Sequence, residues 1–282
     1  MDKIELFDGI TLSFVTYGKT HPHTHESLSH VVEINYCKEG RMGWDPGNGN
    51  KIFLGHGDFS IQNLATCAHS EIIYPNDSYT GLNILIDLKK VMENPLELLK
   101  DQSEHLKHLY TLFCENSEAS SFTGNDETEG IFRCFYEVPE NLRLSYARIK
   151  IIEFILYLIK TLHAPAVKKK EYRDEQIEII KKVHDYMVEH IDEHITIESL
   201  AKTFGMNPTT LKSTFRDIYG DSIAIHTKHH RMEHAAYLLK TTDLTLSEIS
   251  QRIGYESQSK FTAAFKEFFS ILPSEFRKIS KD

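Results

Sequence analysis

The sequence predicts an α+β protein. A strand-rich N-terminal part is expected to fold as an antiparallel β-barrel or sandwich with added helices, and an all-α part with two helix-turn-helix units follows it. Three observations lead to this prediction: short runs of alternating apolar and polar residues fill the first third, the periodicity becomes helical from about Leu88, and the last third contains an internal repeat. A length of 282 residues also favours two domains over one.

The strands are predicted from alternation and from the turns between them. In "HVVEINYC" (30–37), Val32, Ile34 and Tyr36 fall on one side of a strand and the intervening residues, beginning with Glu33, fall on the other. Turns rich in Gly and Asn follow, and further strand candidates are "KIFL", "DFSIQ", "SEIIY" and "TGLNILID". Many short strands with such turns are typical of a small antiparallel barrel or sandwich.

A long helix is predicted over "SYARIKIIEFILYLIKTLH" (145–163), because apolar residues surround most of its girth. Its main apolar stripe consists of Ala147, Ile151, Ile155, Leu158 and Leu162. A helix of this kind is buried, and two partners remain open. The helix packs on its own barrel, or its stripe forms the contact of a homodimer.

The next residues, "HAPAVKKKEYRDE", contain two prolines and a lysine triplet but no apolar periodicity, which is typical of a linker. We therefore expect an N-terminal domain over 1–163, a linker over 164–174 and a helical domain over 175–282. A linker of this composition makes repositioning of the two domains feasible.

Composition narrows the class of protein. The opening residues, "MDKIELFDGI", are acidic and interrupted, so we expect no secretory signal, and the most apolar run, "IIEFILYLI", is far short of a membrane span. Cys37, Cys67, Cys114 and Cys134 lack the paired spacing of a metal site and are expected to be reduced thiols. These features predict a soluble, cytoplasmic protein without a membrane partner.

The net charge gives no support for nucleic-acid binding. It is −9 for the whole chain. Residues 1–173 contain 18 Lys and Arg against 24 Asp and Glu, and residues 174–282 contain 14 against 17, so both parts are acidic. Only the positions of the basic side chains can therefore identify a DNA-binding surface.

Two stretches of the last third align with each other: "TIESLAKTFGMNPTTLKSTFRDIYG" and "TLSEISQRIGYESQSKFTAAFKEFFS". Their apolar positions agree, and each has a glycine, Gly205 or Gly254, where a tight turn after the first helix requires a positive φ. Each copy is therefore predicted to be a helix-turn-helix motif, over about 196–219 and 245–269.

The second helix of each copy has one side without apolar residues. The residues on that side are Thr209, Thr210, Lys212, Ser213 and Arg216 in the first copy, and Gln258, Ser259, Lys260, Thr262 and Lys266 in the second. These side chains are suited to contacts with the phosphates and base edges of double-stranded DNA. A helical hairpin with a solvated face is the alternative, and two matching copies favour DNA reading.

The segment between the copies, "DSIAIHTKHHRMEHAAYLLK" (221–240), is predicted to be one helix. At 1.5 Å per residue it is about 30 Å long, close to one turn of B-DNA at about 34 Å. A rigid connection of this length places two reading helices in successive major grooves.

The region from about Ile177 to Lys278 resembles the DNA-binding domain of AraC/XylS-type transcription regulators. Four pieces carry the resemblance: "SLAKTFGMNPTTLKSTFRDIYG", "RMEHAAYLL", "LSEISQRIGYESQSKFTAAFKE" and "LPSEFRK". Two positions depart from the family pattern, since Ser250 replaces a usual Ala and Ser270 a usual Gly; Ser270 is expected to need a strained turn that weakens the docking of the last helix. The resemblance implies a sequence-specific transcription regulator that is not an enzyme, needs no cofactor, and works with RNA polymerase.

The same family often joins such a domain to an N-terminal cupin-like barrel that binds an effector and carries a dimerising helix. By this resemblance, the candidate effector-binding residues are His23, His25, Glu33, Tyr36, Cys37 and Trp44. A His-x-His pair, a carboxylate and a further His also form a possible metal-ligand set of the cupin kind, namely His23, His25, Glu33 and His69. Solvated or hydrogen-bonded histidines are the commoner case, so no metal is predicted.

The predicted function is an effector-responsive activator that binds DNA as a homodimer. Two alternatives remain open from the sequence. One is a cupin-type metal-dependent enzyme with a helical appendage. The other is a DNA-binding dimer that senses no small molecule.

Overall fold

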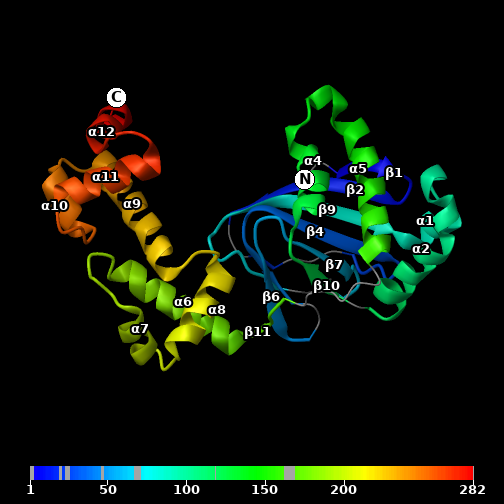
Figure 1. Cartoon of the computed structure of the whole chain (residues 1–282), viewed down its shortest axis with the longest axis horizontal. Helices are drawn as coiled ribbons and strands as arrows, with labels where there is room; N and C mark the ends of the chain where they lie inside the picture. Colours follow the sequence, from blue (N-terminus) through cyan, green and yellow to red (C-terminus); the bar gives the residue numbers. More distant parts are fainter. Residues whose placement is uncertain are drawn as a thin grey trace. The chain divides into compact units, whose positions relative to one another are not determined.

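The computed structural model describes residues 3–18, 21–22, 26–45, 48–66, 71–117, 119–161 and 169–281. It divides into two compact units, Met1–Asp174 and Glu175–Asp282 (Figure 1). The first unit contains antiparallel sheets with helices and the second is helical, which confirms the α+β class. Among the described helices, none combines the length and the apolar character that crossing a bilayer requires.

Antiparallel sheets form the framework of the first unit. The largest has the strand order β1-β2-β9-β4-β7-β10, and the smaller ones have the orders β11-β6-β5 and β3-β8. The strands span Lys3–Phe7 (β1), Ile10–Tyr17 (β2), His21–Pro22 (β3), Val31–Gly40 (β4), Met42–Trp44 (β5), Asn50–Leu54 (β6), Phe59–Asn63 (β7), Glu71–Ile72 (β8), Tyr79–Asp87 (β9), Ser120–Phe122 (β10) and Tyr172–Arg173 (β11). A bridge from Gly43 to Ile73 connects the smaller sheets. The described strands therefore form an open, cupin-like arrangement and not one closed barrel.

The two sides of β4 face different cores, as the alternation predicts. Val32, Ile34 and Tyr36 lie in the main apolar core, which the helices share. Glu33 is buried on the other side, where Cys37 belongs to a smaller core with residues of β5 and β6. The central strand thus separates a helix-covered face from a face with a buried carboxylate.

Helices cover one face of the large sheet, and α5 lies across it (Figure 1). The helices of this unit span Leu88–Glu93 (α1), Ser103–Tyr110 (α2), Asp126–Phe132 (α3), Cys134–Glu137 (α4) and Glu140–Thr161 (α5), with a 3-10 helix at Glu97–Gln102 and a π-helix at Thr111–Glu115. Of the stripe predicted for α5, Ala147, Ile151, Ile155 and Leu158 are buried in this core, and Leu162 lies outside the described residues. The stripe therefore packs on its own sheet, which was one of the two alternatives.

The end of the predicted linker is attached to the first unit. Lys169 forms an ion pair with Asp58, and β11 pairs with β6. The ring of Tyr172 is buried, 6.3 Å from that of Phe53. Residues 169–174 are thus held by an aromatic anchor that charge and proline content did not indicate.

The second unit is helical, and its helices include the two predicted helix-turn-helix stretches and the predicted connecting helix. They span Asp174–Glu189 (α6), Ile197–Thr203 (α7), Pro208–Tyr219 (α8), Ile223–Thr241 (α9), Leu246–Arg252 (α10), Gln258–Phe269 (α11) and Pro273–Lys281 (α12). The 19 residues of α9 form the predicted connecting helix, about 28 Å long at 1.5 Å per residue. One apolar core of this unit contains residues of α9, α10, α11 and α12, so the second repeat is anchored to the connecting helix.

Candidate nucleic-acid interface

The first helix-turn-helix is formed by α7 and α8. The hydroxyl of Thr196 accepts a hydrogen bond from the backbone N–H of Ser199 and caps α7. Gly205 has φ +64° in the turn, and the side chain of Asn207 caps α8 through the N–H of Thr209. Leu211 and Phe215 on the inner side of α8 are fully buried. Because Leu211 and Phe215 fix α8 through its inner side, its outer side remains exposed to solvent.

The second helix-turn-helix repeats this construction in α10 and α11. Thr245 and Glu248 form a reciprocal capping box at the start of α10, which lowers the pKa of Glu248 through hydrogen bonds from Thr245. Gly254 has φ +71°, and Ser257 caps α11. The inner side of α11 is anchored by fully buried aromatic rings, those of Phe261 and Phe265.

The outer sides of α8 and α11 carry the residues predicted to read DNA. All of them are exposed except Thr262, which is half-buried: Thr209, Thr210, Lys212, Ser213, Arg216, Gln258, Ser259, Lys260, Thr262 and Lys266. The Lys260 ammonium pairs with Glu256, whose pKa it lowers by hydrogen bonding and charge. The two helices therefore present polar and basic faces on an otherwise acidic chain.

Arg231 of α9 connects the segment before α7 to the turn of the second repeat, a role that the sequence analysis did not assign to it. Its guanidinium donates to the carbonyl oxygens of Ile191 at 2.9 Å and Glu193 at 2.8 Å, and lies 5.9 Å from the ring centroid of Tyr255. A Cβ on Gly254 would lie 2.6 Å from a guanidinium nitrogen of Arg231. The sequence offered one sign of this role: Arg231 is the first residue of "RMEHAAYLL", in the connector between the repeats.

The two departures from the family pattern have local explanations. Ser270 adopts the left-handed conformation with φ +62°, as expected for a position where glycine is usual. The following helix is nevertheless docked, because the ring of Phe276 lies 5.4 Å from that of Phe265 and Arg277 donates to the Leu244 carbonyl at 2.5 Å. The buried Ser250 satisfies its hydroxyl within α10.

The first unit contains a cavity of about 280 Å³ on the Glu33 side of β4. The buried carboxylate of Glu33 accepts hydrogen bonds from the amides of Gln62 at 2.7 Å and Asn83 at 2.6 Å. Aromatic rings form another wall, with the ring of Tyr17 stacked 5.2 Å from that of Tyr74. A buried carboxylate beside tyrosine rings suits a small ligand with an apolar body and a hydrogen-bond donor.

The other residues predicted to bind an effector have different positions. The ring of Tyr36 stacks on that of Phe132 at 4.1 Å in the main core, and burial raises its pKa to about 12. Cys37 and Trp44 are buried in the smaller core, and burial raises the pKa of the Cys37 thiol to about 12. His23, His25 and His69 lie outside the described residues.

Comparison with known proteins agrees with the doubled motif. A family model described as "Helix-turn-helix domain" matches residues 200–279. The regulatory protein SoxS of Salmonella typhimurium is 30% identical over 100 residues, which cover 36% of this chain and 94% of SoxS. This chain belongs to the AraC/XylS family of transcription regulators.

Two further relatives match different shares of the chain. The lactose operon transcription activator of Staphylococcus xylosus is 26% identical over 175 residues, which span 60% of this chain and 62% of the activator. Among solved structures, the C-terminal domain of AraT, a response regulator from Geobacillus stearothermophilus, is 31% identical, with a TM-score of 0.35; the match covers 36% of this chain and 84% of that domain. The residues that the family model matches all lie in the second unit.

Proposed function

We propose that this AraC/XylS-family protein is a sequence-specific transcription regulator in which α8 and α11 read two successive major-groove segments. The observation that carries the proposal is the repeated geometry. Each helix is anchored inside by buried Phe or Leu and has polar and basic side chains on its outer side. The length of α9, about 28 Å, is close to one helical turn of DNA.

The side chains on the two faces have different proposed roles. Arg216 and Lys266 lie in the last turns of their helices and contact phosphates, which fixes the register of the protein. Gln258, at the first residue of α11, makes a bidentate contact with adenine. Thr209 and Thr262 contact phosphates or thymine methyl groups.

Substitutions at the ends of α11 separate these roles. We expect Lys266→Ala to weaken binding to every DNA sequence and to lower the slope of log K against log salt by about 1, because one phosphate contact is lost. We expect Gln258→Ala to cost about 1–3 kcal/mol on the preferred site and to relax the preference at one base pair. Fluorescence anisotropy on a panel of single-base-pair variants at several salt concentrations measures both effects.

Lys181→Ala is the matched control, because it removes a lysine charge from α6 that is already paired with Glu178. It should change neither the slope nor the base preference. Equal losses on all base variants for both α11 substitutions would contradict the proposed division of roles.

The cavity beside Glu33 supports an effector-binding role for the first unit. Its volume, about 280 Å³, fits a compact molecule. An effector that prefers one arrangement of the chain would shift the protein toward the form that activates transcription with RNA polymerase. The Glu33 carboxylate already accepts amide hydrogen bonds, so we propose ligand recognition there and no catalysis.

Glu33→Gln tests this cavity with little change of shape. Small-molecule fractions of extract from the source cells should raise the thermal midpoint of the wild-type chain, because a ligand that binds only the folded state stabilises it. The substitution should weaken the active ligand about 10- to 100-fold, since hydrogen bonds to a charged group contribute about 1.5–3 kcal/mol. Fractions that leave the wild-type midpoint and the rate of promoter transcription unchanged would favour a regulator that senses no small molecule.

The outer side of α5 supports a homodimer. Leu142, Ile149 and Leu156 recur every seven residues and are 42%, 61% and 40% exposed. Tyr146 lies beside them and is also exposed. Such a stripe is suited to antiparallel or parallel packing against its copy, so we propose that this face, opposite the buried stripe, is the dimer contact.

A further inference from the structure

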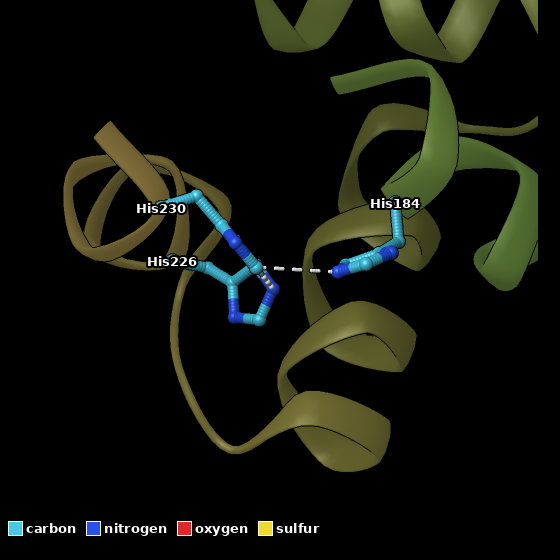
Figure 2. Close-up of side chains that lie close together, drawn as sticks. All are labelled: His184, His226 and His230. Carbon is cyan, nitrogen blue, oxygen red and sulfur yellow. Dashed lines mark hydrogen bonds between the residues drawn. The ribbon is translucent and has the colours of Figure 1, made fainter. Parts of the chain in front are cut away.

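Three histidines of the second unit converge at one point. His184 comes from α6, and His226 and His230 lie one turn apart on α9; Figure 2 shows their rings directed toward one another. The Nε2 atom of His230 lies 3.0 Å from Nε2 of His226 and 3.3 Å from Nε2 of His184. One ligand atom from each residue lies within 4.8 Å of the other two.

The outer ring nitrogens face carboxylates. Nδ1 of His184 lies 3.1 Å from the Asp185 carboxylate, and Nδ1 of His230 lies 3.6 Å from that of Glu233. A histidine that binds metal through one nitrogen usually donates its other N–H to a carboxylate, carbonyl or water. With the protons of His184 and His230 on Nδ1, the lone pairs of both Nε2 atoms point at each other.

With neutral imidazoles, Nε2 of His230 can form only one of its two close contacts as a hydrogen bond. A neutral imidazole has one N–H and one lone pair, and Nε2 of His230 has two ring nitrogens as neighbours. A metal ion bound between the rings would accept a lone pair from each of the three histidines.

Two of the three separations between the ring nitrogens agree with a tetrahedral ion. At Zn–N distances of 2.0–2.1 Å, tetrahedral ligand nitrogens are about 3.3 Å apart, close to the two separations within the cluster. His184 and His230 remain 19% and 30% exposed at their side chains, so an ion has access from solvent. Three imidazoles leave a fourth position for water.

We propose that His184, His226 and His230 form a binding site for Zn²⁺ or a similar divalent transition-metal ion, which would join α6 to α9. The ring of His184 stacks on Tyr219 at 4.7 Å, and that of His226 lies 5.3 Å from Phe215, so the site adjoins the inner side and C-terminal end of α8. The ion thus stabilises the position of the first reading helix. The site is separate from both the DNA-contacting face and the cavity of the first unit.

The test uses the full chain without an affinity tag, treated with a chelator and then titrated with Co²⁺ and Zn²⁺. We expect one Co²⁺ per chain with the visible absorption of a tetrahedral site, displacement by one Zn²⁺, and a higher thermal midpoint with Zn²⁺. His184→Gln and His230→Gln should weaken Zn²⁺ at least about 100-fold, and Glu233→Gln about 10-fold, since loss of outer-shell partners alone costs 10–100-fold.

His229→Gln is the matched control, because His229 precedes His230 on α9 but lies near Asp221 and outside the cluster. It should bind both metals like the wild-type chain and gain the same midpoint shift. Binding that survives His184→Gln and His230→Gln would place the ion elsewhere, for example at the His23 and His25 pair, and would overturn the proposal. The absence of stoichiometric binding by the wild-type chain would overturn it as well.

Discussion

Gly254→Ala should destabilise the second unit more than Gly205→Ala, although both glycines occupy the same position of their repeats. Both have positive φ, which costs a residue with a Cβ about 1–2 kcal/mol. A Cβ at Gly205 meets no atom within 4 Å, whereas one at Gly254 would lie 2.7 Å from the carbonyl oxygen of Asp192 and close to Arg231. Crowding adds about 1–3 kcal/mol, so we expect about 2–5 kcal/mol in total for Gly254→Ala.

Urea unfolding, monitored by circular dichroism, measures the free energy of unfolding of each variant. Fluorescence anisotropy measures the DNA affinity of each variant. Gly205→Ala serves as the control for the loss of glycine alone, at about 1–2 kcal/mol. Equal destabilisation by both substitutions would contradict the role of Gly254 in making room for Arg231 and the Asp192 carbonyl.

Ile149→Asp should convert the proposed dimer into a monomer, because it places a carboxylate in the centre of the exposed stripe of α5. Two linked binding modules gain about 10²–10⁴ in affinity over one. We therefore expect affinity for DNA with two binding sites to fall by about that factor, while affinity for a single site stays unchanged. Light scattering and anisotropy on one-site and two-site DNA measure the two effects.

Leu98→Asp is the matched control. Like Ile149, Leu98 is an exposed aliphatic side chain, 68% exposed, but it lies outside α5. It should leave both the mass and the two-site affinity as in the wild-type chain. A wild-type chain that is monomeric at the concentrations that saturate two-site DNA would reject the dimer proposal.

The helices of the second unit were predictable because local signals agree with the fold. Asn207 before Pro208 marks the start of α8, and the repeated glycines and buried phenylalanines mark the turns and anchors. Ser270 is the exception, since the chain turns there in the left-handed conformation that glycine usually supplies.

The first unit was less predictable, because its contacts are distant in sequence. The sequence gives no sign that Tyr172 pairs its strand with β6, or that Glu33 meets Asn83 from another strand. Whether the stripe of α5 faces its own sheet or a partner depends on tertiary packing and not on periodicity.

The histidine cluster was only partly predictable from the sequence. The spacing of His226 and His230 places both on one side of a helix, and this was visible in the sequence. His184 comes from a different helix, 42 residues earlier than His226, so only the fold brings the third ring into place.

The most direct test of the central claim is a hydroxyl-radical footprint of the full chain on DNA fragments that it retains from sheared genomic DNA of its source, at physiological salt and in the presence of cell extract. We predict two protected blocks per bound chain, about 10–10.5 base pairs apart on one face of the duplex. Arg216→Glu should remove protection of one block, and Lys266→Glu should remove protection of the other. A single protected block, or a footprint that neither substitution changes, would contradict an account in which α8 and α11 both read DNA.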